Sequence, residues 1–386
     1  MTHLRPVSLI IFATMTTNST VDQTWSGFLG RPIQQRDDAS TRNVHEGRSV
    51  LITGAAGSIG SVLARAIAQS SPRRLILLDR SRRRLDALAR SIRADSPQLP
   101  MIAIVGDICH APALDRLFAT YRPEVVYHAA AFKHVPQLES DPFAAIRNNV
   151  LGTCELTCAA IRHSCETFVM LSTDKAVNPH SIMGTTKRIA EMILMRSTSG
   201  KACLRALRLG NVLDSRGSVV PIFRRQIFRG GPVTVTHPEV SRYFITLEEA
   251  GALVLAAASL TGSGGILVPK LGSPRPIMDL ARFMISHQVD IPVVFTGLRP
   301  GEKMTEEMTS SRETVDPNPE RELYRVRSAA VTADDLDESI SALVCSEMQN
   351  DLAAALHVIR HMVPEFHPSD RLMALVDSHQ SRLVRA

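Results

Sequence analysis

The sequence predicts an α/β protein: a doubly wound parallel sheet with a smaller α+β lobe that binds substrate. Two observations carry this prediction. Short apolar runs of strand length recur at spacings of roughly 25 to 40 residues, with helical patterns between them, which is typical of a parallel sheet. The first of these runs leads into a glycine-rich turn and then into a helix. With 386 residues, of which 44% are hydrophobic, the chain can bury a core of this size.

Changes in composition divide the chain into four parts. Residues 1–46 are rich in Thr, Ser, Asn, Gln and Arg without periodicity, so we expect a disordered tail or linker. Residues 47–205 are predicted to form a nucleotide-binding domain, and residues 206–310 a substrate-binding lobe interleaved with it. Residues 311–386 turn polar and end in helical patterns, which predicts a helical C-terminal tail.

Composition and charge disfavour several classes of function. The net charge is +6 but only 4% of residues are aromatic, so we expect an anionic substrate and no nucleic acid. The six cysteines form no CxxC pair and HExxH is absent, which favours reduced thiols, a cytoplasmic location and no metal site. The apolar run at 7–15 is shorter than the ~20 residues of a membrane helix, so no stable membrane insertion is expected.

The strand predicted at 49–53 ends in a turn that is typical of dinucleotide binding. Its glycines are three residues apart, and such turns bring backbone close to a pyrophosphate at a helix N-terminus. The next strand, 75–79, ends in a carboxylate 19 residues after the last glycine, where it can hold the adenosine ribose hydroxyls. The sequence therefore predicts a Rossmann domain that binds NAD(P). The expected cofactor-binding residues are Gly54, Gly57, Ser58, Ile59, Gly60, Asp79, Arg80, Asp107, Ile108, Ala129 and Lys187.

The end of the strand at 75–79 also bears on the choice of cofactor. Asp79 favours NAD, because a carboxylate repels a 2′-phosphate, whereas Arg80 and Arg82 could accommodate that phosphate. We expect NAD, with NADP as the alternative. Asp107, which follows the third strand, either meets the adenine or caps the next helix.

The fourth predicted strand, 125–128, is followed by three alanines, as suits a backbone beside a cofactor. The loop after them carries Lys133, a candidate for substrate binding. Asn149, in the next helical segment, either hydrogen-bonds around the site or is a buried polar residue of the helix.

The candidate catalytic residues follow the next apolar run. Residues 168–171 predict a buried strand that leads into Thr173, Asp174 and Lys175, and the helix after them carries Lys187. In open α/β sheets ligands bind at the carboxyl ends of strands, so this hydroxyl, carboxylate and amine are expected in the site.

Six motifs in this order resemble the extended short-chain dehydrogenase/reductase superfamily: TGAAGSIG, GDI, HAAAFKHVP, NNVLGT, LSTDKAVNP and MGTTK. More narrowly they resemble its nucleotide-sugar 4,6-dehydratase branch, the capsule and flagellin-glycan biosynthesis proteins that act on UDP-N-acetylglucosamine. The likeness covers residues 50–307. Residues 28–32 resemble the segment that joins a membrane region to the catalytic domain in long members, so the chain looks like a shortened version.

The resemblance also implies a substrate set. Residues 215–221 resemble the family's substrate loop, with Asp214 where a glycine is usual, and Arg299 and Glu302 resemble a loop that holds phosphate and ribose. A charged turn is the structural alternative for this second loop. The expected substrate-binding residues are Lys133, Asn211, Arg216, Val219, Pro221, Arg242, Arg299 and Glu302.

The resemblance implies a redox-neutral dehydration with a tightly bound, recycled cofactor. Met183 stands where the superfamily has its catalytic tyrosine, as in one group of these dehydratases, and a thioether does no acid–base work. Proton transfer then falls on Asp174 as acid and on Lys175 as base at C5 of the sugar. Desolvation would have to keep that amine neutral. Thr173 would orient the C4 oxygen and Lys187 the nicotinamide ribose, and a homo-oligomer is implied.

Two other functions stay open from the sequence. A UDP-sugar 4-epimerase needs the same ketone without loss of water. A non-catalytic dinucleotide-binding regulator would account for Met183 and Asp214, although it has no need of the Thr173–Lys175 set.

Overall fold

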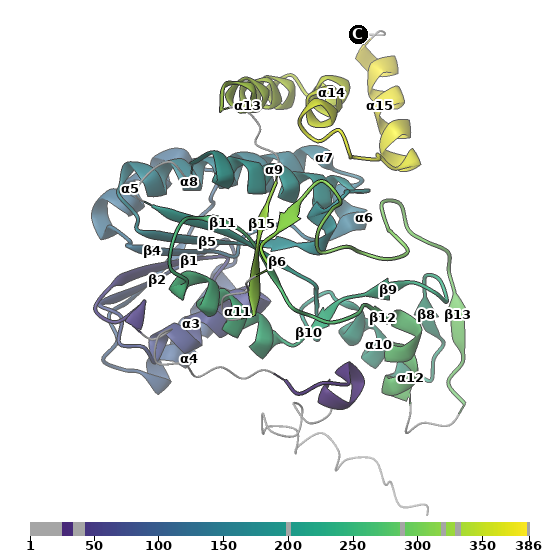
Figure 1. Ribbon diagram of the computed structural model, residues 1–386, viewed down its shortest axis with the longest axis horizontal. Helices are drawn as coiled ribbons and strands as arrows, with labels where there is room; N and C mark the ends of the chain where they lie inside the picture. Colours follow the sequence, from purple (N-terminus) through teal and green to yellow (C-terminus); the bar gives the residue numbers. More distant parts are fainter. Residues whose placement is uncertain are drawn as a thin grey trace, which may run out of the picture.

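The central sheet has the predicted doubly wound order. The computed structural model describes residues 25–33, 43–197, 202–285, 290–317, 322–328 and 333–383 (Figure 1). Seven parallel strands run in the order β3-β2-β1-β4-β5-β6-β11, with the order reversing between β1 and β4. The last edge is extended by β15, antiparallel to β11, and then by β14, antiparallel to β15. In such sheets the reversal point is where ligands bind.

The first six strands of the sheet match predicted runs, whereas β11, β14 and β15 were not predicted. The strands of the sheet are β1 (Ser49–Thr53), β2 (Arg74–Asp79), β3 (Met101–Val105), β4 (Val125–His128), β5 (Thr167–Thr173), β6 (Cys203–Leu209), β11 (Gly265–Pro269), β14 (Thr314–Val315) and β15 (Leu323–Arg327). Successive residues of β1 enter opposite cores: Val50 and Ile52 one, Leu51 the other. A strand buried on both faces is apolar throughout, which is why these runs are readable.

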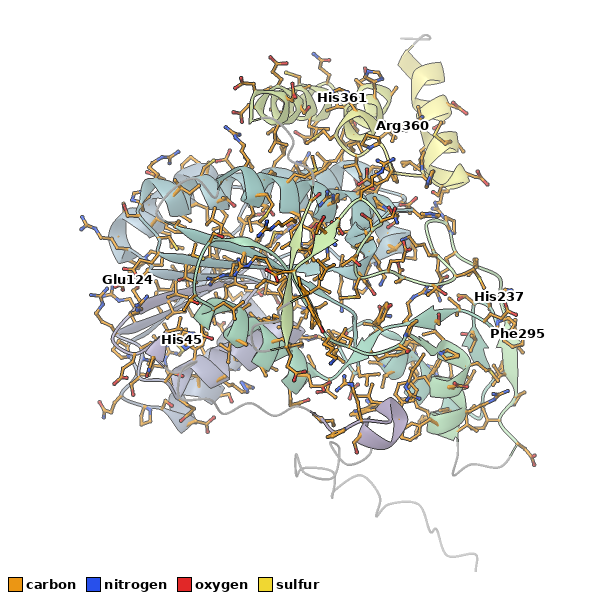
Figure 2. All side chains as sticks on the ribbon, in the orientation of Figure 1. His45, Glu124, His237, Phe295, Arg360 and His361 are labelled. Carbon is orange, nitrogen blue, oxygen red and sulfur yellow. The ribbon has the colours of Figure 1, made fainter. Side chains whose placement is uncertain are left out.

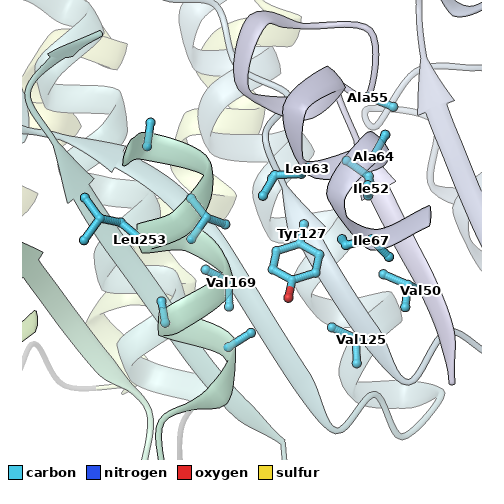
Figure 3. Close-up of a cluster of buried hydrophobic side chains, with 14 of the residues drawn as sticks. Val50, Ile52, Ala55, Leu63, Ala64, Ile67, Val125, Tyr127, Val169 and Leu253 are labelled. Carbon is cyan, nitrogen blue, oxygen red and sulfur yellow. The ribbon is translucent and has the colours of Figure 1, made fainter. Parts of the chain in front are cut away.

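Helices cover both faces of the sheet (Figure 1). One face carries α3 (Ser58–Ala68), α4 (Arg82–Asp95) and α11 (Leu247–Ser259), and the other α5 (Ala111–Tyr121), α8 (Gly152–Arg162) and α9 (Ile182–Arg196). Figure 3 shows the first core, where the Tyr127 ring lies among Val50, Leu63 and Ile67. Its hydroxyl oxygen lies 2.6 Å from His45 Nε2, so this buried polar atom is satisfied.

The smaller lobe is built from short elements after β6. They are β7 (Asn211–Val212), α10 (Val219–Phe228), β8 (Val233–Val235), β9 (Ser241–Arg242), β10 (Phe244–Ile245), β12 (Arg275–Pro276), α12 (Ile277–Ile285) and β13 (Val293–Phe295). In Figure 2, His237 and Phe295 mark the lobe's far end, opposite Glu124, which precedes β4. The lobe therefore stands beyond the carboxyl edge of the sheet.

Part of the N-terminal stretch differs from the predicted disordered tail. Residues 25–29 are helical, and Trp25, Phe28 and Leu29 are buried in the core of the smaller lobe. Arg31 forms an ion pair with buried Glu249 at the start of α11. The segment is too short for its apolar side chains to show a helical period, so the sequence did not predict this helix. Residues 1–24 and 34–42, including the apolar run at 7–15, lie outside the described residues.

The C-terminal part is not only helical, and this corrects the prediction for 311–386. β14 and β15 from this part complete the central sheet. The predicted helices follow as α13 (Ala333–Met348), α14 (Leu352–Met362) and α15 (Asp370–Leu383), which pack over α9. Likewise β6 crosses the predicted domain boundary at 205/206. Among the described residues, no helix combines the length and the apolar character that crossing a membrane requires.

Candidate active site

A cavity of about 810 Å³ opens at the carboxyl edge of the sheet, between the glycine turn and the smaller lobe. Most predicted site residues line it: Gly54, Gly57, Ser58, Ile59, Gly60, Asp79, Arg80, Ile108, Ala129, Lys133, Thr173, Lys175, Met183, Lys187, Asn211, Arg216 and Val219. Six do not line it: Asp107, Asp174, Pro221, Arg242, Arg299 and Glu302. The fold thus brings the glycine turn and the Thr173–Lys175 segment to one cavity.

The glycine turn has the geometry of a dinucleotide cradle. Gly54 has φ +65, and a Cβ there would lie 2.6 Å from the Ala130 backbone N. A Cβ on Gly60 would lie 2.2 Å from the Gly54 carbonyl oxygen, so the first turn of α3 packs directly on the loop. Only glycine permits these approaches, and the half-buried N-terminus of α3 lines the cavity. These residues fit a pyrophosphate.

The two carboxylates predicted to lie near the adenosine of a cofactor, Asp79 and Asp107, mainly hold loops in shape. Asp79 accepts hydrogen bonds from the backbone N–H groups of Ala56 (Oδ2, 2.9 Å) and Ser81 (Oδ1, 2.8 Å). Asp107 Oδ1 accepts from the Cys109 N–H at 2.9 Å, and its other oxygen lies 3.5 Å from Arg80 Nε. Asp107 does not cap the next helix, whose N-cap is His110. It caps the turn before that helix, and it does not line the cavity.

Asn149 fixes the loop that carries Lys133. It lies in a π-helical turn, Ile146–Leu151, accepts from the Phe132 N–H at 2.9 Å and donates to the Phe132 carbonyl at 3.0 Å. Burial lowers the pKa of the Lys133 amine, and nearby Arg216 and Lys175 lower it further. Lys133 Nζ donates to Ser215 Oγ at 3.3 Å, so this lysine links the loop after β4 to the segment that follows β7.

Thr173, Asp174 and Lys175 form one hydrogen-bonded unit at the end of β5. The Thr173 hydroxyl and the Lys175 amine both donate to Asp174 Oδ1, each at 2.9 Å. The Asp174 side chain is 0% exposed, and its Oδ2 has no hydrogen-bond partner among the described residues. The carboxylate therefore lies behind Thr173 and Lys175, which themselves line the cavity.

The role of Lys175 as base requires a neutral amine, and desolvation alone does not provide one in the site without substrate. Burial acts to lower the pKa of Lys175, but Asp174 and Glu306 outweigh it and the net direction is upward. The resting amine is therefore an ammonium. The sequence suggested the effect of desolvation on the Lys175 pKa. It did not suggest the opposing effect of the second carboxylate, Glu306.

The first two turns of α9 carry Met183 and Lys187, which line the cavity. Met183 is buried and lines the cavity, and a Cβ on Gly184 would lie 2.1 Å from the Lys175 carbonyl oxygen, so α9 packs tightly on the Thr173–Lys175 segment. Burial lowers the pKa of Lys187 to about 8, with Glu191 acting in the opposite direction. Lys187 is the less strongly protonated of the two amines at this end.

Residues 214–218, which we call the flap, fold back from the smaller lobe over the glycine turn. The Arg216 guanidinium contacts the Ala56 carbonyl, and its backbone N–H donates to Ser58 Oγ at 3.0 Å. Arg216, which the sequence assigned to substrate, thus contacts the glycine turn, where the cofactor's pyrophosphate was predicted. Asp214 has φ +57, which accounts for the glycine usual there, and its carboxylate pairs with Arg224 at 3.0 Å.

The second predicted substrate loop lies outside the cavity lining. Arg299 is exposed, whereas Arg242 is buried and its Nη2 lies 3.1 Å from Glu302 Oε1. Glu302 Oε2 accepts from the Arg299 N–H at 3.1 Å. Both oxygens of Glu302 are thus engaged within the protein. The described residues contain no cluster of three or more His, Cys, Asp or Glu side chains that could hold a metal.

Comparison with known proteins places the chain in a family. Residues 50–328 match the family model described as polysaccharide biosynthesis protein. The chain belongs to this family. Relatives include a probable polysaccharide biosynthesis protein EpsC of Bacillus subtilis, 41% identical over 79% of this chain and 52% of EpsC. A UDP-glucose 4-epimerase of Rickettsia rickettsii is 33% identical over 72% of this chain and 82% of that protein. The chain therefore spans about half the length of EpsC, but most of the epimerase.

A solved structure shares the architecture. That of Pen from Bacillus thuringiensis superposes with a TM-score of 0.68 at 26% identity, covering 78% of this chain and 98% of Pen. The fold class predicted from the sequence is thereby confirmed.

Proposed function

We propose that this protein is a nucleotide-sugar 4,6-dehydratase that converts UDP-N-acetylglucosamine to a UDP-4-keto-6-deoxy-N-acetylhexosamine for surface polysaccharide synthesis. The observation that carries the proposal is the Asp174–Lys175 pair, 2.9 Å apart, in the part of the molecule that also holds the glycine turn. Elimination of water needs both an acid and a base. A 4-epimerase needs neither at C5 and C6.

The cavity residues would hold NAD, with NADP as the alternative. Gly54, Gly57 and Gly60 would lie against its pyrophosphate, Asp79 and Arg80 near its adenosine ribose, and Lys187 at its nicotinamide ribose. The bound nicotinamide supplies the transient oxidation at C4 and the hydride that returns to C6.

Transfer of one proton within the Asp174–Lys175 pair supplies both partners of the elimination. When the Lys175 ammonium gives its proton to Asp174, the pair becomes a neutral amine and a carboxylic acid. The amine then takes the C5 proton. The acid, which lies behind the cavity lining, passes its proton through the Thr173 hydroxyl to the C6 hydroxyl that leaves as water. The elimination leaves an ammonium and a carboxylate. The ammonium returns a proton to C5 as the hydride arrives at C6, and solvent then reprotonates the amine. Exclusion of water by bound substrate favours the uncharged pair.

Thr173 and Lys187 would act around this pair. Thr173 lines the cavity with its hydroxyl on Asp174 Oδ1, so it can orient the C4 oxygen and relay the proton released by C4 oxidation to solvent. Met183 fills the position next to them without exchanging protons.

Incubation of the purified protein with UDP-N-acetylglucosamine tests the proposal. We expect a product lighter by one water, with a C4 ketone and a C6 methyl group by NMR. A product of unchanged mass and inverted C4 would favour the 4-epimerase, the alternative that the Rickettsia relative supports. Recovery of unchanged substrate by protein that holds its cofactor would contradict both activities.

Replacing Arg216 tests the role of the flap. We expect Arg216→Ala to weaken dinucleotide binding by roughly 3- to 10-fold, because a charge-assisted contact near the pyrophosphate is lost from a partly exposed position. Cofactor retained after gel filtration measures this. Arg225→Ala, on the exposed side of α10, is the matched control. A raised KM for the sugar nucleotide with unchanged cofactor retention would instead restore Arg216 to the substrate set.

A further inference from the structure

The lysines of this chain are few and concentrated at the cavity. The sequence contains six, at positions 133, 175, 187, 201, 270 and 303, within a total of 44 Lys and Arg. Lys133, Lys175 and Lys187 line the cavity, and Lys303 Nζ donates to the Val177 carbonyl, beside the Lys175 turn, at 2.8 Å. Arginine is always charged, whereas a lysine changes charge readily with its surroundings. The groups around each of these amines therefore decide what it can do.

Lys175 has acceptors on three sides. Its Nζ lies 2.9 Å from Asp174 Oδ1, 2.9 Å from Asn211 Oδ1 and 3.6 Å from Glu306 Oε1. Two cations, Arg242 and Lys133, also act on this region and oppose the charge of the ammonium. The balance of these groups depends on the two carboxylates.

Glu306 is the more distant carboxylate, and it is held in place from the smaller lobe. Its side chain is 3% exposed, Oε1 lies 3.9 Å from Arg242 Nε, and Oε2 lies 3.7 Å from Lys303 Nζ. Oε2 has no hydrogen-bond partner among the described residues. A buried carboxylate beside three cations, with one oxygen unbonded, is not needed to complete the local hydrogen bonding. Its charge is its main contribution.

We propose that Glu306 is a positioning residue that holds the Lys175 amine as an ammonium in the resting site and so limits proton transfer to Asp174. Asp174 bonds the amine directly and receives its proton, whereas Glu306 stabilises the charge from the other side. The same residue meets Arg242, which binds Glu302 of the predicted nucleotide loop. The role in turnover rests on the proposed function, but the effect on the Lys175 charge does not.

Lysine NMR measures this effect directly. In protein labelled with ¹³C at lysine Cε, the Lys175 signal is one of six and can be assigned by its loss in Lys175→Arg. We expect Glu306→Gln to start losing the Lys175 proton at least about one pH unit below the wild type, since a carboxylate at this distance shifts an amine by that order. Glu307→Gln is the matched control: this exposed neighbour bonds Asn178 Nδ2 at 2.8 Å and should leave the titration unchanged.

Kinetics separate this inference from the proposed function. If the dehydratase proposal holds, the limb of the kcat–pH profile that reports Lys175 moves to lower pH in Glu306→Gln by the same amount. If the Lys175 titration shifts in Glu306→Gln but the wild-type protein does not dehydrate UDP-N-acetylglucosamine, the Glu306 inference stands and the proposed function is wrong. Identical Lys175 titrations in Glu306→Gln, Glu307→Gln and the wild type overturn the inference. Should Glu306→Gln fail to fold, Glu306→Asp must show a smaller shift in the same direction, and an unshifted signal there overturns it equally.

Discussion

Asp174→Asn should reduce the rate of dehydration by roughly 10²- to 10⁴-fold, the range usual for loss of a positioned general acid. The amide keeps the size of the carboxylate but cannot receive the Lys175 proton. It therefore removes the acid and blocks formation of the neutral amine. Thr173 Oγ1 and Lys175 Nζ both donate hydrogen bonds to Asp174 Oδ1. The amide oxygen of asparagine can accept both of these bonds, so the fold should persist. Initial rates of water loss from UDP-N-acetylglucosamine measure the effect.

Asp214, an acidic residue at the start of the flap, offers a matched control for Asp174. Asp214→Asn makes the same change at a φ of +57, a conformation that asparagine adopts readily, and loses only a partly exposed pair with Arg224. Its activity should stay near that of the wild type. Exchange of the C5 hydrogen with solvent deuterium adds a second readout. Lys175→Ala should abolish this exchange, and undiminished exchange would eliminate Lys175 as the base. If the Asp174→Asn enzyme kept more than a tenth of wild-type activity, another residue would have to be the acid.

The sequence was most informative where a feature is local. Strand 49–53 could be assigned because a strand that is buried on both faces is apolar throughout. The turn after it could be assigned because its three glycines fall within seven residues. The Thr173–Lys175 segment follows from the same logic, since parallel strands end at one edge. By contrast, residues 25–29 and 323–327 are short, and they become ordered only against partners far along the chain. No periodicity in so few residues predicts such packing.

The electrostatics of the site were the least accessible from sequence. The pKa direction at Lys175 depends on Glu306, and the location of Arg216 depends on how the flap crosses the glycine turn. Both are contacts between segments that the chain order separates. Ser172 is similar: its hydroxyl meets Glu191, which pairs with fully buried Arg208. The net charge of +6 predicted that the substrate is an anion. It did not predict which cationic side chains lie near that substrate.

The glycine turn provides the second large expected effect. Gly60→Ala should cost about 1–3 kcal/mol, as an added methyl group does in a well-packed site. Its Cβ would lie 2.2 Å from the Gly54 carbonyl oxygen and 3.0 Å from Ala55 Cα, both backbone atoms that can yield only by moving the turn. If the turn absorbs this strain, dinucleotide affinity should fall roughly 5- to 150-fold, at 1.4 kcal/mol for each factor of ten. Calorimetric titration with NAD and with NADP measures the loss.

A second glycine-to-alanine change shows whether this loss is specific to the turn. Gly27 is also helical, and a Cβ there would meet only the Phe283 ring, at 4.0 Å. Gly27→Ala should therefore keep both cofactor affinity and melting temperature. If Gly60→Ala binds the dinucleotide as tightly as Gly27→Ala does, the pyrophosphate does not lie against this turn. The cavity's cofactor and substrate halves would then have to be reassigned, because the acid–amine pair gains its proposed role only beside an oxidising nicotinamide.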